Sequence, residues 1–174
     1  YNQTGNDNSI IGYAAGGSGG GGVNSFSGVT AIGSGALNKI TTASNLTAVG
    51  YQSLYSNTTG TLNSAVGYQA LYANTTGTSN TAVGNLSLYN NQIGSSNTAF
   101  GYQTLYNNNA DTNLAIGYRT MYLNTTGTVN LAVGDQALYY NSTGSNNTAV
   151  GYSSLFFNGI GQYNTALGDR KSTR

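Results

Sequence analysis

A glycine that returns at nearly constant intervals dominates this sequence and restricts the folds open to it. This glycine closes the motif Asn-Thr-Ala-Val-Gly or a close variant, and we call it the anchor glycine. Successive anchors lie 21, 17, 17, 17, 17, 16, 17, 17 and 17 residues apart. So short and regular a period predicts an all-β fold, a parallel β-solenoid (β-roll) of about ten 17-residue rungs. The anchors are Gly12, Gly33, Gly50, Gly67, Gly84, Gly101, Gly117, Gly134, Gly151 and Gly168.

Uniform repetition predicts a single repeat domain over residues 1–174, with one irregular stretch. A glycine-rich run at residues 16–22 accounts for the longest interval and predicts a flexible excursion at residues 14–28. Charged residues make up only 5% of the chain and the net charge is +1, so we expect no nucleic-acid partner. No apolar run approaches the ~18 residues of a membrane span, so we expect no membrane insertion in this segment.

Each rung is expected to contain two short strands and two turns. The consensus, written from the motif onward, is Asn-Thr-Ala-Val-Gly-Tyr-Gln-Ala-Leu-Tyr-x-Asn-Thr-Thr-Gly-x-x. The residue before the anchor is always branched or aromatic, which predicts a first buried core column. Its members are Ile32, Val49, Val66, Val83, Phe100, Ile116, Val133, Val150 and Leu167. A second core column is predicted four residues past the anchor, at Leu37, Leu54, Leu71, Leu88, Leu105, Met121, Leu138 and Leu155.

Turn and ladder residues occupy the rest of the rung. A second glycine, ten residues past the anchor, is expected to supply a backbone conformation that other residues resist. It occurs as Gly60, Gly77, Gly94, Gly127, Gly144 and Gly161, and the rung after Gly101 replaces it with the shorter stretch 107–111. The asparagine four residues before most anchors is predicted to form a hydrogen-bonded ladder. Its members are Asn63, Asn80, Asn97, Asn113, Asn130, Asn147 and Asn164.

An aromatic residue directly follows each buried leucine from Leu54 onward. Because neighbours on a strand point to opposite faces, we expect this aromatic column to point outward, with rings about 4.8 Å apart. Exposed aromatic stripes indicate interfaces, so the column is a candidate ligand or interface surface. Its members are Tyr55, Tyr72, Tyr89, Tyr106, Tyr122, Tyr139 and Phe156. A partial further column consists of Tyr51, Tyr68, Tyr102, Tyr118 and Tyr152.

The small predicted core favours self-association. Two buried apolar side chains per rung offset only part of the conformational entropy lost when 17 residues are ordered. Ladder hydrogen bonds contribute more, and burial of the aromatic column against another chain would contribute further. We therefore expect an obligate homo-oligomer, either a side-by-side homotrimer or a head-to-tail filament.

The stretch Val-Thr-Ala-Ile-Gly-Ser-Gly-Ala-Leu at residues 29–37, and each Asn-Thr-Ala-Val-Gly, resemble the head repeats of YadA-like trimeric autotransporter adhesins. They also resemble repeat regions of phage tail fibres. The resemblance covers nearly the whole chain and implies a left-handed β-roll, three chains side by side, and an adhesive role in an extracellular, cell-surface or virion fibre. This chain departs from the adhesin pattern in its longer period, its additional tyrosines and its Asn-Thr-Thr-Gly turn.

Residues for catalysis and metal binding are scarce. The chain has no His, no Cys and no Glu, and its carboxylate side chains are Asp7, Asp111, Asp135 and Asp169. Acid–base and nucleophilic chemistry need convergent titratable groups, so we expect no catalytic residues and no enzymatic activity. A calcium-binding β-roll would repeat an aspartate in each turn, so we expect neither a metal site nor a cofactor.

The composition leaves several functions open. We expect a structural or adhesive fibre module that contacts surface glycans or partner filaments. An alternative is ice binding by the threonine column Thr30, Thr47, Thr81, Thr98, Thr148 and Thr165, which Leu114 and Leu131 interrupt. If the residue before the anchor points inward, however, these threonines point inward too. A tailspike glycosidase is less favoured, because its only carboxylate pair, Asp135 and Asp169, would lie roughly 10 Å apart.

The repeated turn also carries Asn-x-Thr sequons. Such sequons are acceptors for N-glycosylation in cells that have the machinery. The sequence therefore predicts a glycoprotein with candidate attachment sites at Asn57, Asn74, Asn124 and Asn141.

Overall fold

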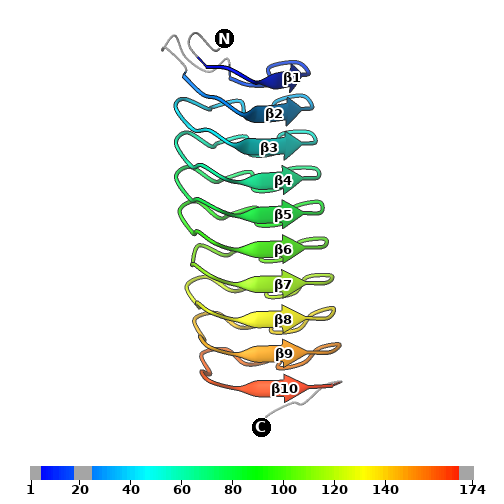
Figure 1. Ribbon diagram of the computed structural model, residues 1–174. Helices are drawn as coiled ribbons and strands as arrows, with labels where there is room; N and C mark the ends of the chain where they lie inside the picture. The colour runs from blue at the N-terminus through cyan, green and yellow to red at the C-terminus, as the bar shows by residue number, and fades with distance from the viewer. Residues whose placement is uncertain (1–4, 18–24, 169–174) are drawn as a thin grey trace.

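The computed structural model describes residues 5–17 and 25–168, and builds them into one ten-stranded sheet. Figure 1 shows the strands stacked one above another with their arrows in the same direction. Each strand pairs in parallel with the next along the chain, as in Thr81↔Thr98 between β5 and β6. The predicted all-β parallel solenoid is confirmed; it has about nine turns, and the described residues include no helix. The left-handed sense of the coil stays a prediction.

The strands are three or four residues long. They are β1 (Ser9–Ile11), β2 (Val29–Ile32), β3 (Leu46–Val49), β4 (Ser64–Val66), β5 (Thr81–Val83), β6 (Thr98–Phe100), β7 (Leu114–Ile116), β8 (Leu131–Val133), β9 (Thr148–Val150) and β10 (Thr165–Leu167).

Each rung contains one strand, so the prediction of two strands per rung is wrong. The segment after the anchor glycine is a turn in which Gln52 and Leu54 adopt left-handed backbone conformations, with φ of 52° and 50°. The anchor itself needs glycine. At Gly67, φ is 139° and a Cβ atom would lie 2.6 Å from the Gly84 carbonyl oxygen. The chain therefore bends sharply where the sequence pattern suggested an extended strand.

The prediction of the first core column is also wrong, because the residue before each anchor points outward. Within the strand, alanine lies inside with an exposed fraction of 0% and its two neighbours face outward. The interior is narrow, and buried leucine and asparagine side chains already occupy it. Only a methyl group then fits beneath the sheet. The buried alanines are Ala31, Ala48, Ala65, Ala82, Ala99, Ala115, Ala132 and Ala149.

The second core column is confirmed. All eight residues of the set that runs from Leu37 to Leu155 and includes Met121 are buried. These side chains enter the interior from the turn opposite the alanines, where the left-handed conformation of residues such as Leu71 (φ 53°) aims them inward. The apolar interior is therefore an alanine column facing a leucine column.

The predicted asparagine ladder is confirmed in detail. Asn80 Nδ2 donates to Asn63 Oδ1 (3.2 Å) and to the Gly94 carbonyl oxygen (2.8 Å). Asn80 Oδ1 in turn accepts from the backbone N–H (3.0 Å) and Nδ2 (3.1 Å) of Asn97. Both polar atoms of the side chain are thereby satisfied by hydrogen bonds to the neighbouring rungs.

A second buried ladder runs through the Asn-Thr-Thr-Gly turns. Asn74 Nδ2 donates to Asn57 Oδ1 (2.6 Å) and to the Gly77 carbonyl oxygen (3.1 Å). The same pattern repeats through the described rungs, at Asn57, Asn74, Asn91, Asn108, Asn124, Asn141 and Asn158. Two amide ladders, one on each side of the second glycine, therefore tie consecutive rungs together.

The second glycine column is required for a reason different from the predicted one. Gly77 has no positive φ, so its backbone conformation is open to other residues. A Cβ atom there would instead lie 2.5 Å from Asn74 Oδ1 and would also collide with the Gly94 carbonyl oxygen. The shortened rung keeps the ladder with Ala110, whose carbonyl oxygen accepts from Asn97 Nδ2 (2.7 Å).

The predicted excursion at residues 14–28 is only partly described, since residues 18–24 lie outside the described part of the chain. On its two sides, the Gly16 N–H donates to the Ala36 carbonyl oxygen (2.9 Å), and Phe26 is buried in the core. Both flanks therefore rejoin the rungs.

Replacement of Asn80 by alanine should lower the free energy of unfolding by roughly 2–5 kcal/mol, because it leaves the buried backbone N–H of Asn97 without a partner and removes further hydrogen bonds to Asn63 and Gly94. Urea unfolding followed by circular dichroism measures the loss. Thr76→Ala, at an exposed turn position, is the control and should change stability by less than about 0.5 kcal/mol. Equal effects of the two substitutions would contradict a structural role for the ladder.

Candidate interaction surface

The aromatic column predicted as a ligand or interface surface forms one continuous stack. Ring centroids in consecutive rungs are 5.1 to 5.4 Å apart from Tyr55 to Phe156, and the planes tilt by 8° to 18°. The rings are half-buried because each covers the face of the next. The outer surface of this column consists of ring edges and hydroxyl groups, while its faces are occupied within the chain. Its role as a ligand site stays a prediction.

Cations lie against this stack at two places. Lys39 Nζ is 5.4 Å from the centroid of Tyr55, the first ring of the stack. The Arg119 guanidinium is 5.7 Å from the centroid of Tyr122 and 5.2 Å from that of Tyr118, and its Nε donates to Gln103 Oε1 (2.7 Å). Cations within about 6 Å of ring centroids are attracted by the ring quadrupole, so both contacts stabilise the stack.

Burial raises the pKa of the Tyr72 and Tyr106 phenols above 10.0, and repulsion between neighbouring phenolates of the stack raises it further. Burial likewise raises the pKa of Tyr139, although the positive charge of Arg119 opposes this shift. These three phenols of the stack therefore resist ionisation.

The five tyrosines of the partial further column, which directly follow their anchors, form a separate and more exposed column. Tyr51 and Tyr68 stack with a centroid distance of 5.5 Å, and so do Tyr102 and Tyr118. These side chains are 40% to 51% exposed. Tyr13 holds the same position after the first anchor, and Ser34, Asn85, Asp135 and Asp169 hold it in the rungs that lack a tyrosine there. We call this set the corner column, since it lies just past the bend at the anchor.

A surface that the sequence pattern missed is the outer face of the sheet. The residues before the anchors form a line of branched and aromatic side chains, which we call the outer column. Ile32, Val66, Phe100 and Ile116 are 37% to 40% exposed. The full set is Ile11, Ile32, Val49, Val66, Val83, Phe100, Ile116, Val133, Val150 and Leu167. The signal that could have revealed the outward direction of these side chains is the alanine that precedes each of them from Ile32 onward. A residue as small as alanine in each of these rungs indicates that this position faces the tightly packed interior.

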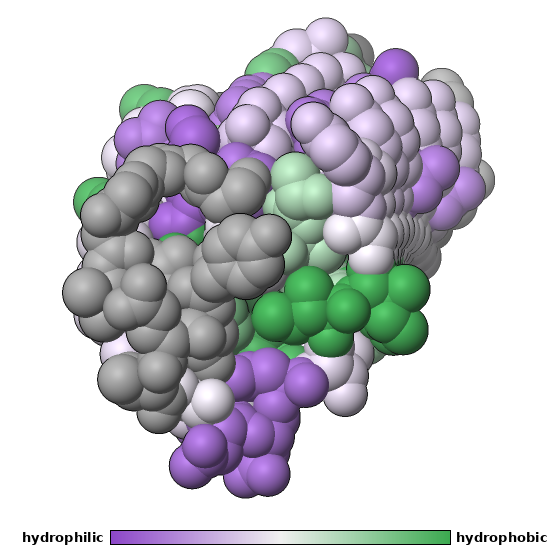
Figure 2. Space-filling model, turned by 90° about the horizontal axis from the view of Figure 1, so that it is seen from above, coloured by the Kyte–Doolittle hydropathy of each residue, from purple (hydrophilic) through white to green (hydrophobic). Residues whose placement is uncertain are grey.

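The threonine column also faces outward, two residues before the outer column. Thr30, Thr47, Thr81, Thr98 and Thr148 are half-buried, and the structure gives their hydroxyl groups no hydrogen-bond partner among the described residues. The turn threonines differ, since the Thr75 hydroxyl donates to the Gln92 carbonyl oxygen (3.0 Å). Seen along the stack in Figure 2, rows of pale, weakly polar side chains recede in parallel, beside a compact green apolar group.

The predicted glycosylation sites are part of the second amide ladder. Asn57, Asn74, Asn124 and Asn141 have exposed fractions of 0%, and their Nδ2 atoms each donate to a carbonyl oxygen inside the chain. A glycan on any of these atoms is incompatible with the described packing. The sequons are present in the sequence, but a sequon carries no information about whether its asparagine is buried.

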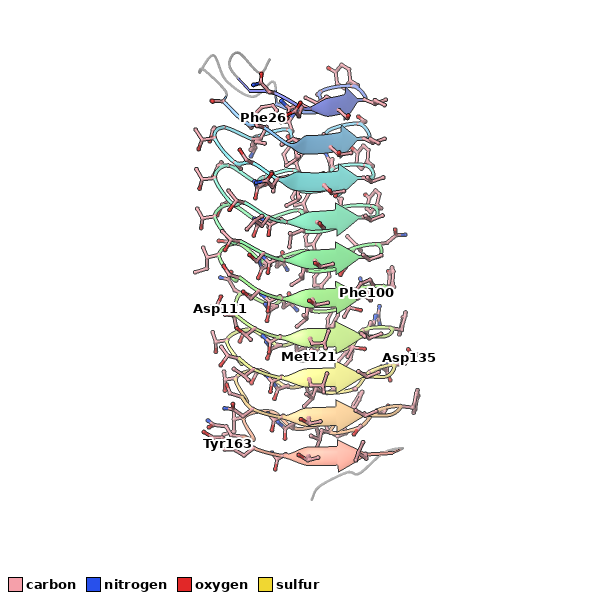
Figure 3. All side chains as sticks on the ribbon, in the orientation of Figure 1. Phe26, Phe100, Asp111, Met121, Asp135 and Tyr163 are labelled. Atoms are coloured by element: carbon pink, nitrogen blue, oxygen red, sulfur yellow. The ribbon has the colours of Figure 1, made fainter. Side chains whose placement is uncertain are left out.

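The carboxylates are dispersed. Figure 3 places Asp111 and Asp135 on opposite edges of the solenoid. Asp111 accepts from the Ser95 N–H (2.7 Å) and Asp135 from the Tyr118 N–H (2.9 Å), so each carboxylate forms a hydrogen bond with the rung before it. Asp169, the other member of the predicted glycosidase pair, lies outside the described residues. Within residues 5–17 and 25–168, no three carboxylates gather at one metal-binding position.

Comparison of the chain with protein-family models, with curated proteins and with solved structures gives no match. The described part of the chain also contains no helix of the length and apolarity needed to cross a membrane. The fold and its surfaces are therefore the basis for a functional proposal.

The raised pKa values predict that the protein loses stability at alkaline pH. A phenol whose pKa is higher in the folded chain contributes stability that is complete below pH ~10 and is lost as the pH rises through the raised value. Unfolding midpoints in urea should therefore fall as the pH increases above about 10, and Tyr106→Phe should reduce this fall. The same pH dependence in both proteins would contradict the assignment.

Proposed function

We propose that this chain is a rigid segment of an extracellular fibre, such as an adhesin head or a phage tail fibre, that associates side by side with copies of itself. The observation that carries the proposal is the outer column, which presents a branched or aromatic side chain on every strand from β1 to β10. In a monomer this line faces water. Contiguous apolar stripes of this kind are typical of protein interfaces.

A second copy of the chain is the partner that fits this stripe best. Its outer column has the same spacing of about 4.8 Å between rungs, so apolar side chains meet at every rung of the contact. Few charges oppose the approach, since Asp7, Lys39, Asp111, Arg119 and Asp135 are the charged residues of the described chain. None of them belongs to the outer column. The apolar surface runs along the side of the solenoid, which favours side-by-side association over a head-to-tail filament, and a trimer is the form that the resembling adhesins suggest.

The same surfaces support a passive role rather than catalysis. The side chains that the solenoid repeats along its length are amides, hydroxyls and aromatic rings, and its carboxylates stand apart. These groups, held at fixed intervals, are sufficient for a structural and adhesive module. Such a module contacts surface carbohydrate or partner filaments.

Lysine at two outer-column positions should abolish self-association without unfolding the chain. In Val66→Lys/Phe100→Lys the new charges face outward, two rungs apart, where assembly would bury them at a high desolvation cost. Light scattering should give the mass of the monomer, 17.9 kDa, for this variant and a multiple of it for the parent chain.

Thr59→Lys/Ile93→Lys is the matched control, because it places the same charges two rungs apart on the exposed turn and should retain the oligomer. Circular dichroism checks that both variants are folded. A monomeric parent chain, or equal masses for the two double variants, would refute the proposed interface.

Ice binding is a second candidate, which the outward direction of the threonine column favours. The expectation that these threonines point inward is wrong, because it followed from the error about the outer column. Their unpaired hydroxyls lie in register, as in Thr30↔Thr47 and Thr81↔Thr98. An array of hydroxyl and methyl groups at the regular spacing of a flat sheet is suited to ordering water. Self-association and ice binding would use the same face, so they exclude one another.

Measurements of thermal hysteresis and ice-crystal shape test ice binding directly. If the sheet face binds ice, the parent chain should depress the freezing point below the melting point, and Thr81→Leu should weaken this effect. Leucine occurs naturally at this position in β7 and β8, so the variant should fold. Thr59→Leu, on the turn, is the control. Freezing behaviour equal to that of buffer would eliminate ice binding.

A further inference from the structure

The corner column is interrupted by small polar residues, at regular intervals from Ser34 to Asp135. In successive rungs it reads Tyr13, Ser34, Tyr51, Tyr68, Asn85, Tyr102, Tyr118, Asp135, Tyr152 and Asp169. From Ser34 to Asp135, two tyrosines separate consecutive polar residues, so the polar residues recur there every three rungs, although the basic repeat of the chain is a single rung. No feature of the core or of the outer column follows this longer period, so the solenoid itself does not require it.

At Asn85 the interruption leaves two aromatic faces opposite one another. Tyr68 stacks on Tyr51 and Tyr102 stacks on Tyr118, so each has one face covered within its own pair. The other faces look toward the rung of Asn85. Two rung spacings separate the rings of Tyr68 and Tyr102 by about 10 Å. Favourable ring-to-ring distances are about 4.5–7 Å, so one further ring fits midway and contacts both tyrosines.

The base of this interruption is polar and open to solvent. Asn85 Oδ1 accepts from the Tyr68 N–H (3.2 Å), and this bond fixes the orientation of the amide. The structure gives Asn85 Nδ2 no acceptor among the described residues, so a donor remains free between the two rings. Asp135 makes the equivalent bond to the Tyr118 N–H, but there the Arg119 guanidinium already lies against the Tyr118 ring. The interruption at Asn85 is therefore the more open of the two.

We propose that the interruption at Asn85 binds one pyranose ring of a neutral carbohydrate, between Tyr68 and Tyr102. A pyranose has two faces of C–H groups, which pack on aromatic rings, and hydroxyl groups around its edge, which accept from Asn85 Nδ2. A purely apolar ring would bury this amide donor without a partner, which costs free energy. A charged ligand would find no opposite charge among these three residues. The inference specifies the carbohydrate contact of the proposed adhesive fibre and rests on that function.

Asn85 and Asp135 hold equivalent positions three rungs apart. The polar interruptions at Asn85 and Asp135 lie about 14 Å apart, so a single extended oligosaccharide parallel to the solenoid axis reaches both. The outer column lies before the anchor bend and the corner column after it. Side-by-side association through the outer column therefore leaves the corner column available for this contact.

Asn85→Tyr tests the site by filling it. The substitution continues the tyrosine column as in the neighbouring rungs, so the fold should be retained while the added ring occupies the place of the sugar. The probe is a panel of immobilised neutral oligosaccharides built from glucose, galactose, mannose and N-acetylglucosamine. The parent chain should bind at least one member of the panel, and Asn85→Tyr should weaken that binding at least about tenfold.

Two further variants keep the test decisive. Ser79→Tyr adds an exposed tyrosine at a turn position that Tyr163 holds in another rung, and should bind like the parent chain. Tyr102→Ser removes one of the two aromatic rings and should also lose binding. It replaces Asn85→Tyr as the test if Asn85→Tyr fails to fold. Unchanged binding by both Asn85→Tyr and Tyr102→Ser overturns the inference, and so does a parent chain that binds no member of the panel. Neither result affects the oligomer mass, by which the proposed self-association is judged.

Discussion

The rung-to-rung hydrogen bonds of buried asparagine amides are the interaction on which the rest of this solenoid depends. A rung of 17 residues encloses little space, and its apolar interior is reduced to an alanine facing a leucine. The two amide ladders fill the remaining interior and bond to the carbonyl oxygens of the second glycine column. No buried side-chain N or O atom of the described residues lacks a hydrogen-bond partner. Such complete satisfaction is what makes a largely polar interior stable.

The ladders also explain the glycines. A Cβ atom at Gly60 or Gly144 would collide with the asparagine amide that the turn surrounds. The anchor glycines from Gly12 to Gly151 likewise leave no room for a Cβ atom, and in addition the anchors form a backbone bend with positive φ at the end of each strand. Two columns that look alike in the sequence therefore meet different constraints. The second glycine column is limited by space alone, and the anchor column also by the direction of the chain.

The period, the parallel stacking, the leucine column and the first asparagine ladder could be predicted from the sequence, because each follows from repetition and residue chemistry alone. The direction of the strand side chains could not. Ile, Val and Phe before the anchor have the chemistry of a core, and only the volume taken by Leu71 or Leu88 on the opposite side forces alanine inward. The left-handed conformations of Gln52 and Leu54 were likewise hidden, since neither residue type favours them. The aromatic stack was visible as a column, but the exposed outer column appears only once the parity of the strand is known.

The hydrogen bonds of this molecule run predominantly in one direction, along the stack, and each rung is bonded to its immediate neighbours. A pulling force along the axis therefore acts on a few short strand bonds and two amide contacts at a time, and separates rungs one after another. A force across the axis instead has to shear many parallel bonds together. The solenoid is thus mechanically anisotropic, and lateral association with other chains would strengthen its weaker direction.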